Sequence, residues 1–168
     1  MRTIIAGAIL TAVIACPTLA GTTKEDFITD MKVVETIGQW QLRKGTDSFT
    51  DKISCVMLNN GNGHYQATNH DFFIKNEKTG RVYAHRLRFD ENAPSFEKRA
   101  SDAEVLNNAV DIEWFDYGAL LSASRLRVEI TTKPSHGNKA SLSTYVVDLD
   151  VRGFAAMRES WQKNGCPH

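Results

Sequence analysis

The tripeptide Arg-Leu-Arg occurs twice in the sequence, as Arg86-Leu87-Arg88 and as Arg125-Leu126-Arg127. Each copy lies in a stretch of alternating apolar and polar residues, which is typical of a β-strand with one buried face. Both arginines of a copy therefore leave the same face of their strand. If the two strands are neighbours, the four guanidinium groups form one patch suited to carboxylate or phosphate groups. Arg86, Arg88, Arg125 and Arg127 are therefore a candidate binding site for a partner.

An ordinary charged sheet face is the alternative interpretation of these arginines. Glu113 or Glu129 would then pair with them across the sheet.

Paired carboxylates that could act as a general acid and base occur at Asp111 with Glu113 and at Asp148 with Asp150. The two members of each pair are two positions apart, so on a strand they lie on the same face. A solvated strand face explains these pairs equally well. We therefore assign no catalytic residue.

The histidines are spread along the chain, at His64, His70, His85, His136 and His168. His64 and His70 flank a turn-rich hairpin that also holds Asp71, so a metal site can be drawn there. The pattern lacks the tight His-x-x-x-His or Cys-x-x-Cys spacing of zinc sites, and we assign no metal ligand. His85 lies on the apolar side of its strand, where a hydrogen-bonded core histidine is the expected role.

Other motifs that would indicate catalysis or cofactor binding are absent from the sequence. It contains no Gly-x-Ser-x-Gly, no phosphate-binding loop and no dinucleotide fingerprint, and we predict no cofactor. Lys and Arg together number 20, as do Asp and Glu, for a formal net charge of +0. Nucleic-acid binding depends on many phosphate contacts, and a neutral chain gives no electrostatic reason to expect it.

Residues 1–20 have the pattern of a secretory signal peptide. Arg2 precedes an apolar run over 4–15, and small residues, including Thr18 and Ala20, follow it. The run is too short for a membrane span, which needs about 20 apolar residues. We predict cleavage after Ala20, which leaves a single β-rich domain at 21–168 in the periplasm or outside the cell.

A lipoprotein is the alternative product of export. Val13-Ile14-Ala15-Cys16 resembles a bacterial lipobox, and cleavage before Cys16 would anchor the chain to a membrane through a lipid. Pro17 beside Cys16, and the small-residue exit at Ala20, favour the soluble form. A membrane association is expected only if Cys16 is lipidated.

Two cysteines remain in either case, and we predict that Cys55 and Cys166 form a disulfide. Export places both thiols in an oxidising compartment, and no third free thiol competes. Cys55 lies in a strand over 52–58, and Cys166 follows a helix over 153–163 that must dock on an apolar surface. Docking near Cys55 would bring the sulfurs together. Two buried free thiols are the alternative.

The remaining pattern consists of short strands separated by turns. Strands are expected over 40–43, 52–58, 65–74, 81–90, 110–115, 124–132 and 142–149. A turn is expected over 45–51, with Asp47 accepting from nearby backbone N–H groups. Short helices are plausible before Gly38 and within 92–108, and Phe154, Met157 and Trp161 form one stripe of the terminal helix. The fold class is mainly β: an antiparallel β-sandwich or small barrel with a short C-terminal helix.

Several of these features occur in the same order in known exported proteins. They are Trp40, the Asp47-Ser48-Phe49-Thr50-Asp51 turn, Cys55, the two Arg-Leu-Arg strands, the 148–154 segment and Cys166. This order resembles small exported proteobacterial proteins, including the invasion-associated locus B family and accessory lipoproteins of type VI secretion clusters. The resemblance implies a periplasmic β-rich domain and says little about chemistry.

We therefore expect a non-catalytic binding or accessory module whose partner is a protein or a cell-envelope component. The alternative is a small envelope hydrolase that uses Asp or His residues on loops. A deep cleft with a carboxylate or histidine of strongly shifted pKa would favour the enzyme. An exposed apolar or arginine patch would favour binding.

Overall fold

The computed structural model describes residues 31–59, 64–113, 115–134 and 141–167. Within these ranges one antiparallel sheet has the strand order β1-β2-β3-β4-β5-β8: β1 Lys32–Ile37, β2 Trp40–Thr46, β3 Ile53–Asn59, β4 Tyr65–Ala67, β5 Phe72–Lys75 and β8 Ala109–Ile112. A second has the order β10-β9-β6-β7: β10 Ser143–Asp150, β9 Arg125–Lys133, β6 Arg81–Phe89 and β7 Lys98–Arg99. The predicted signal peptide, Cys16, His136 and His168 lie outside the described residues.

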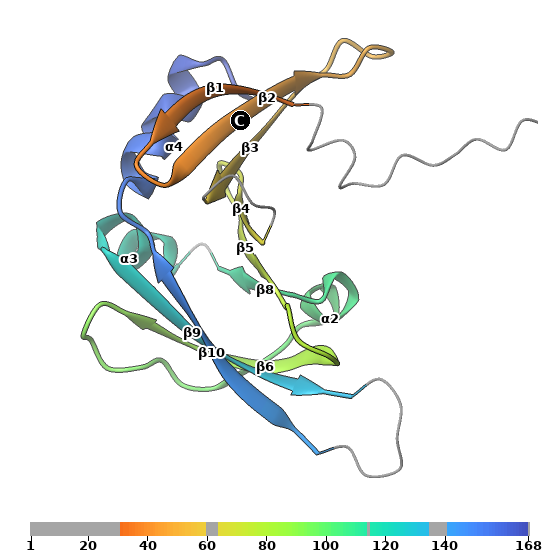
Figure 1. Ribbon diagram of the computed structural model, residues 1–168, viewed down its shortest axis with the longest axis vertical. Helices are drawn as coiled ribbons and strands as arrows, with labels where there is room; N and C mark the ends of the chain where they lie inside the picture. The colour runs from red at the N-terminus through yellow and green to blue at the C-terminus, as the bar shows by residue number, and fades with distance from the viewer. Residues whose placement is uncertain (1–30, 60–63, 114, 135–140, 168) are drawn as a thin grey trace, which may run out of the picture.

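Three helices complete the described part of the chain: α2 Asp102–Asn107, α3 Tyr117–Ser122 and α4 Phe154–Lys163. Figure 1 shows the six-stranded sheet running from β1–β3 at the top to β8, the four-stranded sheet at the bottom, and α3 and α4 on the left. Neither sheet closes into a barrel within the described ranges. The predicted mainly-β class with antiparallel sheets and a C-terminal helix is confirmed.

The core is formed by apolar side chains from both sheets and from α3 and α4. At its centre the Trp40 ring lies 5.7 Å from the Phe72 ring and 5.0 Å from the Phe154 ring, measured between centroids. Phe72 and Phe154 are in turn 5.2 Å apart in an edge-to-face arrangement, which aromatic pairs favour. These three rings join β2, β5 and α4, so the C-terminal helix is packed into the same core as the sheets.

Alternation along β9 separates the core from the outer face of the four-stranded sheet. Leu126, Val128 and Ile130 are fully buried, while Arg125 is exposed and Glu129 is half-buried on the opposite side. This inside-outside pattern is the one that the sequence predicts. The charged residues of β9 are therefore held on a surface whose position is fixed by burial of the other side.

Two predicted segments differ in detail from the structure. Residues 32–37 form β1 and not the end of a helix, because β1 pairs with β2 through a turn at Gly38, whose φ is 58°. The stretch 65–74 is a hairpin of β4 and β5 and not one extended strand. Thr68 and Asp71 make the turn, with the Thr68 backbone N–H donating to the Asp71 carbonyl oxygen over 2.8 Å.

The helix expected within 92–108 is shorter than its apolar spacing suggests. It begins only at Asp102, where a capping box between Ser101 and Glu104 satisfies the first turn. Phe96 and Leu106, two large apolar residues of the 92–108 range, are 96% and 77% exposed. The helix is held by polar contacts of Glu104 and not by an apolar stripe.

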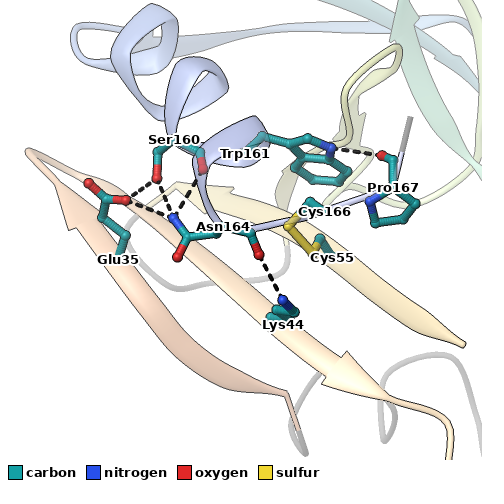
Figure 2. Close-up of a disulfide and its surroundings, with 8 residues drawn as sticks. All are labelled: Glu35, Lys44, Cys55, Ser160, Trp161, Asn164, Cys166 and Pro167. Carbon is teal, nitrogen blue, oxygen red and sulfur yellow. Dashed lines mark hydrogen bonds between the residues drawn. A yellow bond between two sulfur atoms is a disulfide. The ribbon is translucent and has the colours of Figure 1, made fainter. Parts of the chain in front are cut away.

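The disulfide between Cys55 and Cys166 is present, with Cα atoms 5.8 Å apart, and confirms the predicted pairing (Figure 2). Hydrogen bonds hold the same end of the chain on both sides of the sulfurs. The Lys44 ammonium donates to the Asn164 carbonyl oxygen over 2.7 Å, and the Trp161 indole N–H donates to the Pro167 carbonyl oxygen over 2.8 Å. The C-terminus is thereby attached to β2 and β3.

Candidate functional site

The two Arg-Leu-Arg segments lie on neighbouring strands, as a shared patch requires. β6 pairs with β9, with Arg88 opposite Arg127 and Arg86 opposite Glu129. We call the outer surface of β6, β9 and β10 that carries Arg86, Arg88, Arg125 and Arg127 the arginine face. The structure thus brings all four predicted residues onto one face, although carboxylates lie among them.

Each arginine of this face contacts a carboxylate. Arg86 makes a bidentate contact with Glu129, with Nε and Nη2 donating over 2.9 and 2.8 Å. Arg125 makes a similar contact with Asp148 on β10, in which Nε donates to Oδ1 over 2.8 Å. Glu129 is one of the two carboxylates that the charged-face interpretation named. The Arg86–Glu129 pair agrees with the charged-face interpretation, and partner binding by the four arginines stays a prediction.

Arg88 and Arg127 share a single acidic residue, Glu91, which follows β6. The shortest contacts are 2.9 Å from Arg88 Nη2 to Glu91 Oε2 and 3.0 Å from Arg127 Nη2 to Glu91 Oε1. The Arg127 guanidinium also donates to the Asp90 carbonyl oxygen over 2.7 Å. No pattern in the sequence singles out Glu91, because its role depends on the β6–β9 pairing.

These ion pairs alter the ionisation of their members in the expected direction. The hydrogen bond that Arg125 donates to Asp148 lowers the pKa of Asp148, and the hydrogen bond that Arg86 donates to Glu129 raises the pKa of Arg86. The side chains of Arg125 and Asp148 are nevertheless about half exposed, at 47% and 45%. Exposed pairs of this kind contribute little to stability, so they can exchange partners at low energetic cost.

A second group of predicted residues meets in a hollow beside β8. His70 and Asp71 from the β4–β5 turn line it together with Asp111 and Glu113, and its volume is about 460 Å³. The sequence placed the His70–Asp71 pair and the Asp111–Glu113 pair in separate groups, and the pairing of β5 with β8 joins them. His64, in contrast, lies away from this group and contacts Glu77 at 3.3 Å.

Asp111 is the carboxylate of this hollow whose ionisation is most clearly shifted. Burial raises its pKa to about 6, and the nearby carboxylates of Asp71 and Glu104 add to the effect. A group with this pKa exchanges protons near neutral pH, as a general acid or base does. No group of three or more His, Cys, Asp or Glu side chains within the described ranges has the geometry to hold a metal ion.

His85 is buried beside Glu104, as expected for a core histidine, but its Nδ1 atom makes no hydrogen bond within the described ranges, contrary to the expected hydrogen-bonded role. Both side chains are 3% exposed, and His85 Nδ1 is 3.5 Å from Glu104 Oε1. Burial lowers the pKa of His85. Burial would raise the pKa of Glu104, but hydrogen bonds from the backbone N–H groups of Ser101 and Asp111 hold it below the ordinary value. This pair connects β6 to α2 and β8 and has a structural role.

Comparisons with known proteins give little further information. No protein-family model matches the sequence, and the search of curated proteins found no match. Among solved structures, the fold is similar to the crystal structure of invasion associated protein B from Bartonella henselae, with 15% sequence identity and a TM-score of 0.47 over 77% of this chain and 97% of that one. At these values the likeness is a weak resemblance and assigns no function. None of the helices described is long and apolar enough to cross a membrane.

Proposed function

We propose that the protein is an exported, non-catalytic binding module of the cell envelope, and that the arginine face binds an acidic protein or envelope component. The observation that supports the proposal most directly is the placement of four arginines on one sheet face, opposite a buried and mainly apolar face. Guanidinium groups bind carboxylates and phosphates through paired hydrogen bonds.

The pairing of these arginines with Glu91, Glu129 and Asp148 fits a binding face that is stable while empty. The acidic side chains keep the guanidinium groups oriented, and the strands fix their spacing. An incoming carboxylate or phosphate would replace exposed contacts, and the net change in electrostatic energy would be small. Such a surface contributes mainly to the rate of association and to the choice of partner.

Export is the part of the proposal that rests on residues 1–20 and on the disulfide. A disulfide persists in oxidising compartments, which include the periplasm and the extracellular space. Intact mass of the protein from its native cells would test it. A chain that begins at Gly21 is expected, and a mass that includes a diacylglycerol on Cys16 would replace the soluble form with an anchored lipoprotein.

Binding is tested with the mature chain immobilised and exposed to a periplasmic extract at low and high salt. The double variant Arg86→Ser with Arg125→Ser should lose the captured partner, while thermal stability changes little because both pairs are exposed. A matched double variant, Lys52→Ser with Lys163→Ser, removes the same charge elsewhere and should retain capture. Equal capture by all three proteins would overturn the binding role of the arginine face.

The pKa of Asp111 supports a second candidate, a small hydrolase that uses the hollow beside β8. Deprotonated Asp111 would activate water, so hydrolysis of chromogenic carboxyl and phosphate esters should rise with pH through about 6. The variant Asp111→Asn should abolish this turnover. If the wild-type protein hydrolyses none of these esters faster than that variant, the hydrolase candidate fails.

A further inference from the structure

The end of β6 that lies away from the arginine face holds a second cationic feature, arranged around Tyr83. The β6–β9 register shifts between Val82 and Ala84, so Tyr83 is the extra residue of a β-bulge. Bulges redirect side chains and are frequent beside functional sites. Arg99 of β7 pairs with Ala84 on the other side of the strand. The bulge thus places the Tyr83 ring next to the side chain of Arg99.

Three cations line a pocket of about 310 Å³ at this position: Arg81, Arg99 and Lys133. The guanidinium carbon of Arg99 lies 3.6 Å from the centre of the Tyr83 ring, and Lys133 Nζ lies 6.0 Å from the same centre. The remaining lining residues are apolar: Val82, Ala100, Val105 and Pro134. We call this the Tyr83 pocket.

Among the residues that the structure describes, the cations of the Tyr83 pocket differ from those of the arginine face in making no ion pair with a carboxylate. None of the pocket's lining residues is acidic. Within the part of the chain that the structure describes, the ion pairs involve neither Arg99 nor Lys133. Arg81 uses one amino group as a donor to the Val105 carbonyl oxygen, over 2.9 Å. For the side chains of Arg99 and Lys133, the contact seen among the described residues is that with the Tyr83 ring.

This arrangement has a physical consequence for binding. Three positive charges around one hollow, without an internal counter-charge, create a local positive potential that attracts an anion. Stacking on Tyr83 uses the face of the Arg99 guanidinium and leaves its edge donors available. It also restricts the plane of the guanidinium, so less conformational entropy is lost when a ligand binds. Charge-assisted hydrogen bonds would then contribute more than neutral ones.

We propose that the Tyr83 pocket binds a small organic anion. Its phosphate or carboxylate group contacts Arg99 and Lys133, and its apolar body lies against Val105 and Pro134. The volume is at the lower end of the range for small-molecule sites, about 300 to 1,000 Å³. The Tyr83 pocket is separate from the arginine face, and anion binding in the pocket does not depend on partner binding by that face.

Calorimetric titration of the mature protein at low salt tests the proposal with three probes: phenyl phosphate, inorganic phosphate and phenol. Phenyl phosphate should bind, inorganic phosphate should bind about tenfold more weakly, and phenol should not bind. The double variant Arg99→Gln with Lys133→Gln should weaken phenyl phosphate at least about tenfold, since each lost charge-assisted hydrogen bond contributes on the scale of a tenfold change in affinity.

A matched control removes the same two residue types beside other tyrosines. Lys78 Nζ lies 6.0 Å from the centre of the Tyr145 ring, and the Arg158 guanidinium lies 5.6 Å from that of Tyr117. The variant Lys78→Gln with Arg158→Gln should bind phenyl phosphate within about twofold of wild type. An equal loss in both double variants would show a general charge effect and overturn the assignment to the pocket.

A variant that fills the pocket but keeps every charge tests whether the ligand occupies the pocket itself. Val105→Trp should block phenyl phosphate and leave the thermal midpoint close to that of wild type, because Val105 is only half-buried. Absence of phenyl phosphate binding to wild type, or unchanged binding to Val105→Trp, overturns the proposal. Equal affinity for phenyl and inorganic phosphate overturns the role of the apolar wall. Loss of partner capture with intact phenyl phosphate binding would concern the arginine face alone.

Discussion

Arg88 and Arg127 lie directly opposite each other on β6 and β9, and both contact the single carboxylate of Glu91. Two like charges in opposite positions of a sheet are destabilising unless a counter-charge is present. Glu91 supplies that charge from outside the strands, and its side chain is 76% exposed. It is therefore the residue through which the arginine face can be altered with the least effect on the core.

Replacement of Glu91 by Gln should increase binding of an acidic partner and decrease stability only slightly. The two guanidinium groups lose their neutralising carboxylate, while the strands that carry them are unchanged. We expect the free energy of unfolding to fall by less than about 1 kcal/mol, as for other exposed ion pairs. Denaturant unfolding and capture at low salt measure the two effects. A loss of capture in this variant would contradict the binding role of Arg88 and Arg127.

Removal of the Cys55–Cys166 disulfide should destabilise the protein substantially. The bond closes a loop between residues 111 positions apart, for which chain entropy gives an upper limit of about 4–5 kcal/mol. Contacts of Lys44 and Trp161 hold the same segment without the sulfurs, so the Cys55→Ser with Cys166→Ser variant should still fold. Urea unfolding should show that the free energy of unfolding falls by about 2–4 kcal/mol in this variant.

Thiol titration of the denatured protein without reductant provides the corresponding chemical test. On a chain prepared without residues 1–20, it should find no reactive thiol, because Cys55 and Cys166 are paired. If reduction of the wild-type protein lowers stability as much as the double substitution, the lost stability is assigned to the bond. Two reactive thiols per chain would contradict the structure at this point.

The sequence was informative wherever one property of a residue determined its position. Alternation placed Leu126, Val128 and Ile130 in the core, and the stripe of Phe154 and Met157 identified the buried side of α4. The disulfide was predicted because export would place the thiols in an oxidising compartment and because only two cysteines lie after residue 20. Asp47 was correctly assigned to its turn, where it accepts from the backbone N–H groups of Phe49 and Thr50 over 2.9 and 2.8 Å.

Features that depend on pairing between distant segments were not predictable in the same way. The helical spacing before Gly38 was outweighed by the pairing of β1 with β2, because strand pairing satisfies the backbone of both segments. The Tyr83 pocket requires the β-bulge at Tyr83, and the alternation of apolar and polar residues does not reveal where the pairing of two strands contains an extra residue. Glu104 was missed because a carboxylate in a short helix ordinarily faces solvent.

Replacement of Glu104 by Ala should cause a large loss of stability. The carboxylate accepts hydrogen bonds from the backbone N–H groups of Ser101 and Asp111, over 2.8 and 3.0 Å, and lies beside buried His85. Removal of the carboxylate leaves buried N–H donors without acceptors, and we expect the free energy of unfolding to fall by about 2–4 kcal/mol. Asp102→Ala, an exposed acidic residue on the same helix, is the control and should change stability by less than about 0.5 kcal/mol.

The pH dependence of stability should also show the His85–Glu104 pair. The pKa values of both groups are lowered in the folded protein, so each contributes stability that is present above its unfolded pKa and is lost as pH falls. The decline should begin below about 6.5 for His85 and below about 4.5 for Glu104. Urea unfolding at several pH values measures it. Stability that increases on acidification through this range in an Asp111→Asn background would contradict the assignment.

Asp111 acts in the opposite direction, and its replacement by Asn should stabilise the protein at neutral pH. Burial raises its pKa from 3.8 to about 6, so the folded state is favoured most below the unfolded pKa and loses this advantage as pH rises through about 6. The shift corresponds to about 3 kcal/mol. Screening by solvent at this half-buried position reduces the expected gain to about 1–2 kcal/mol at pH 7.5. Urea unfolding of wild type and variant at pH 4 and pH 7.5 should show the gain only at the higher value, whereas a loss at pH 7.5 would mean that ionised Asp111 makes a stabilising contact.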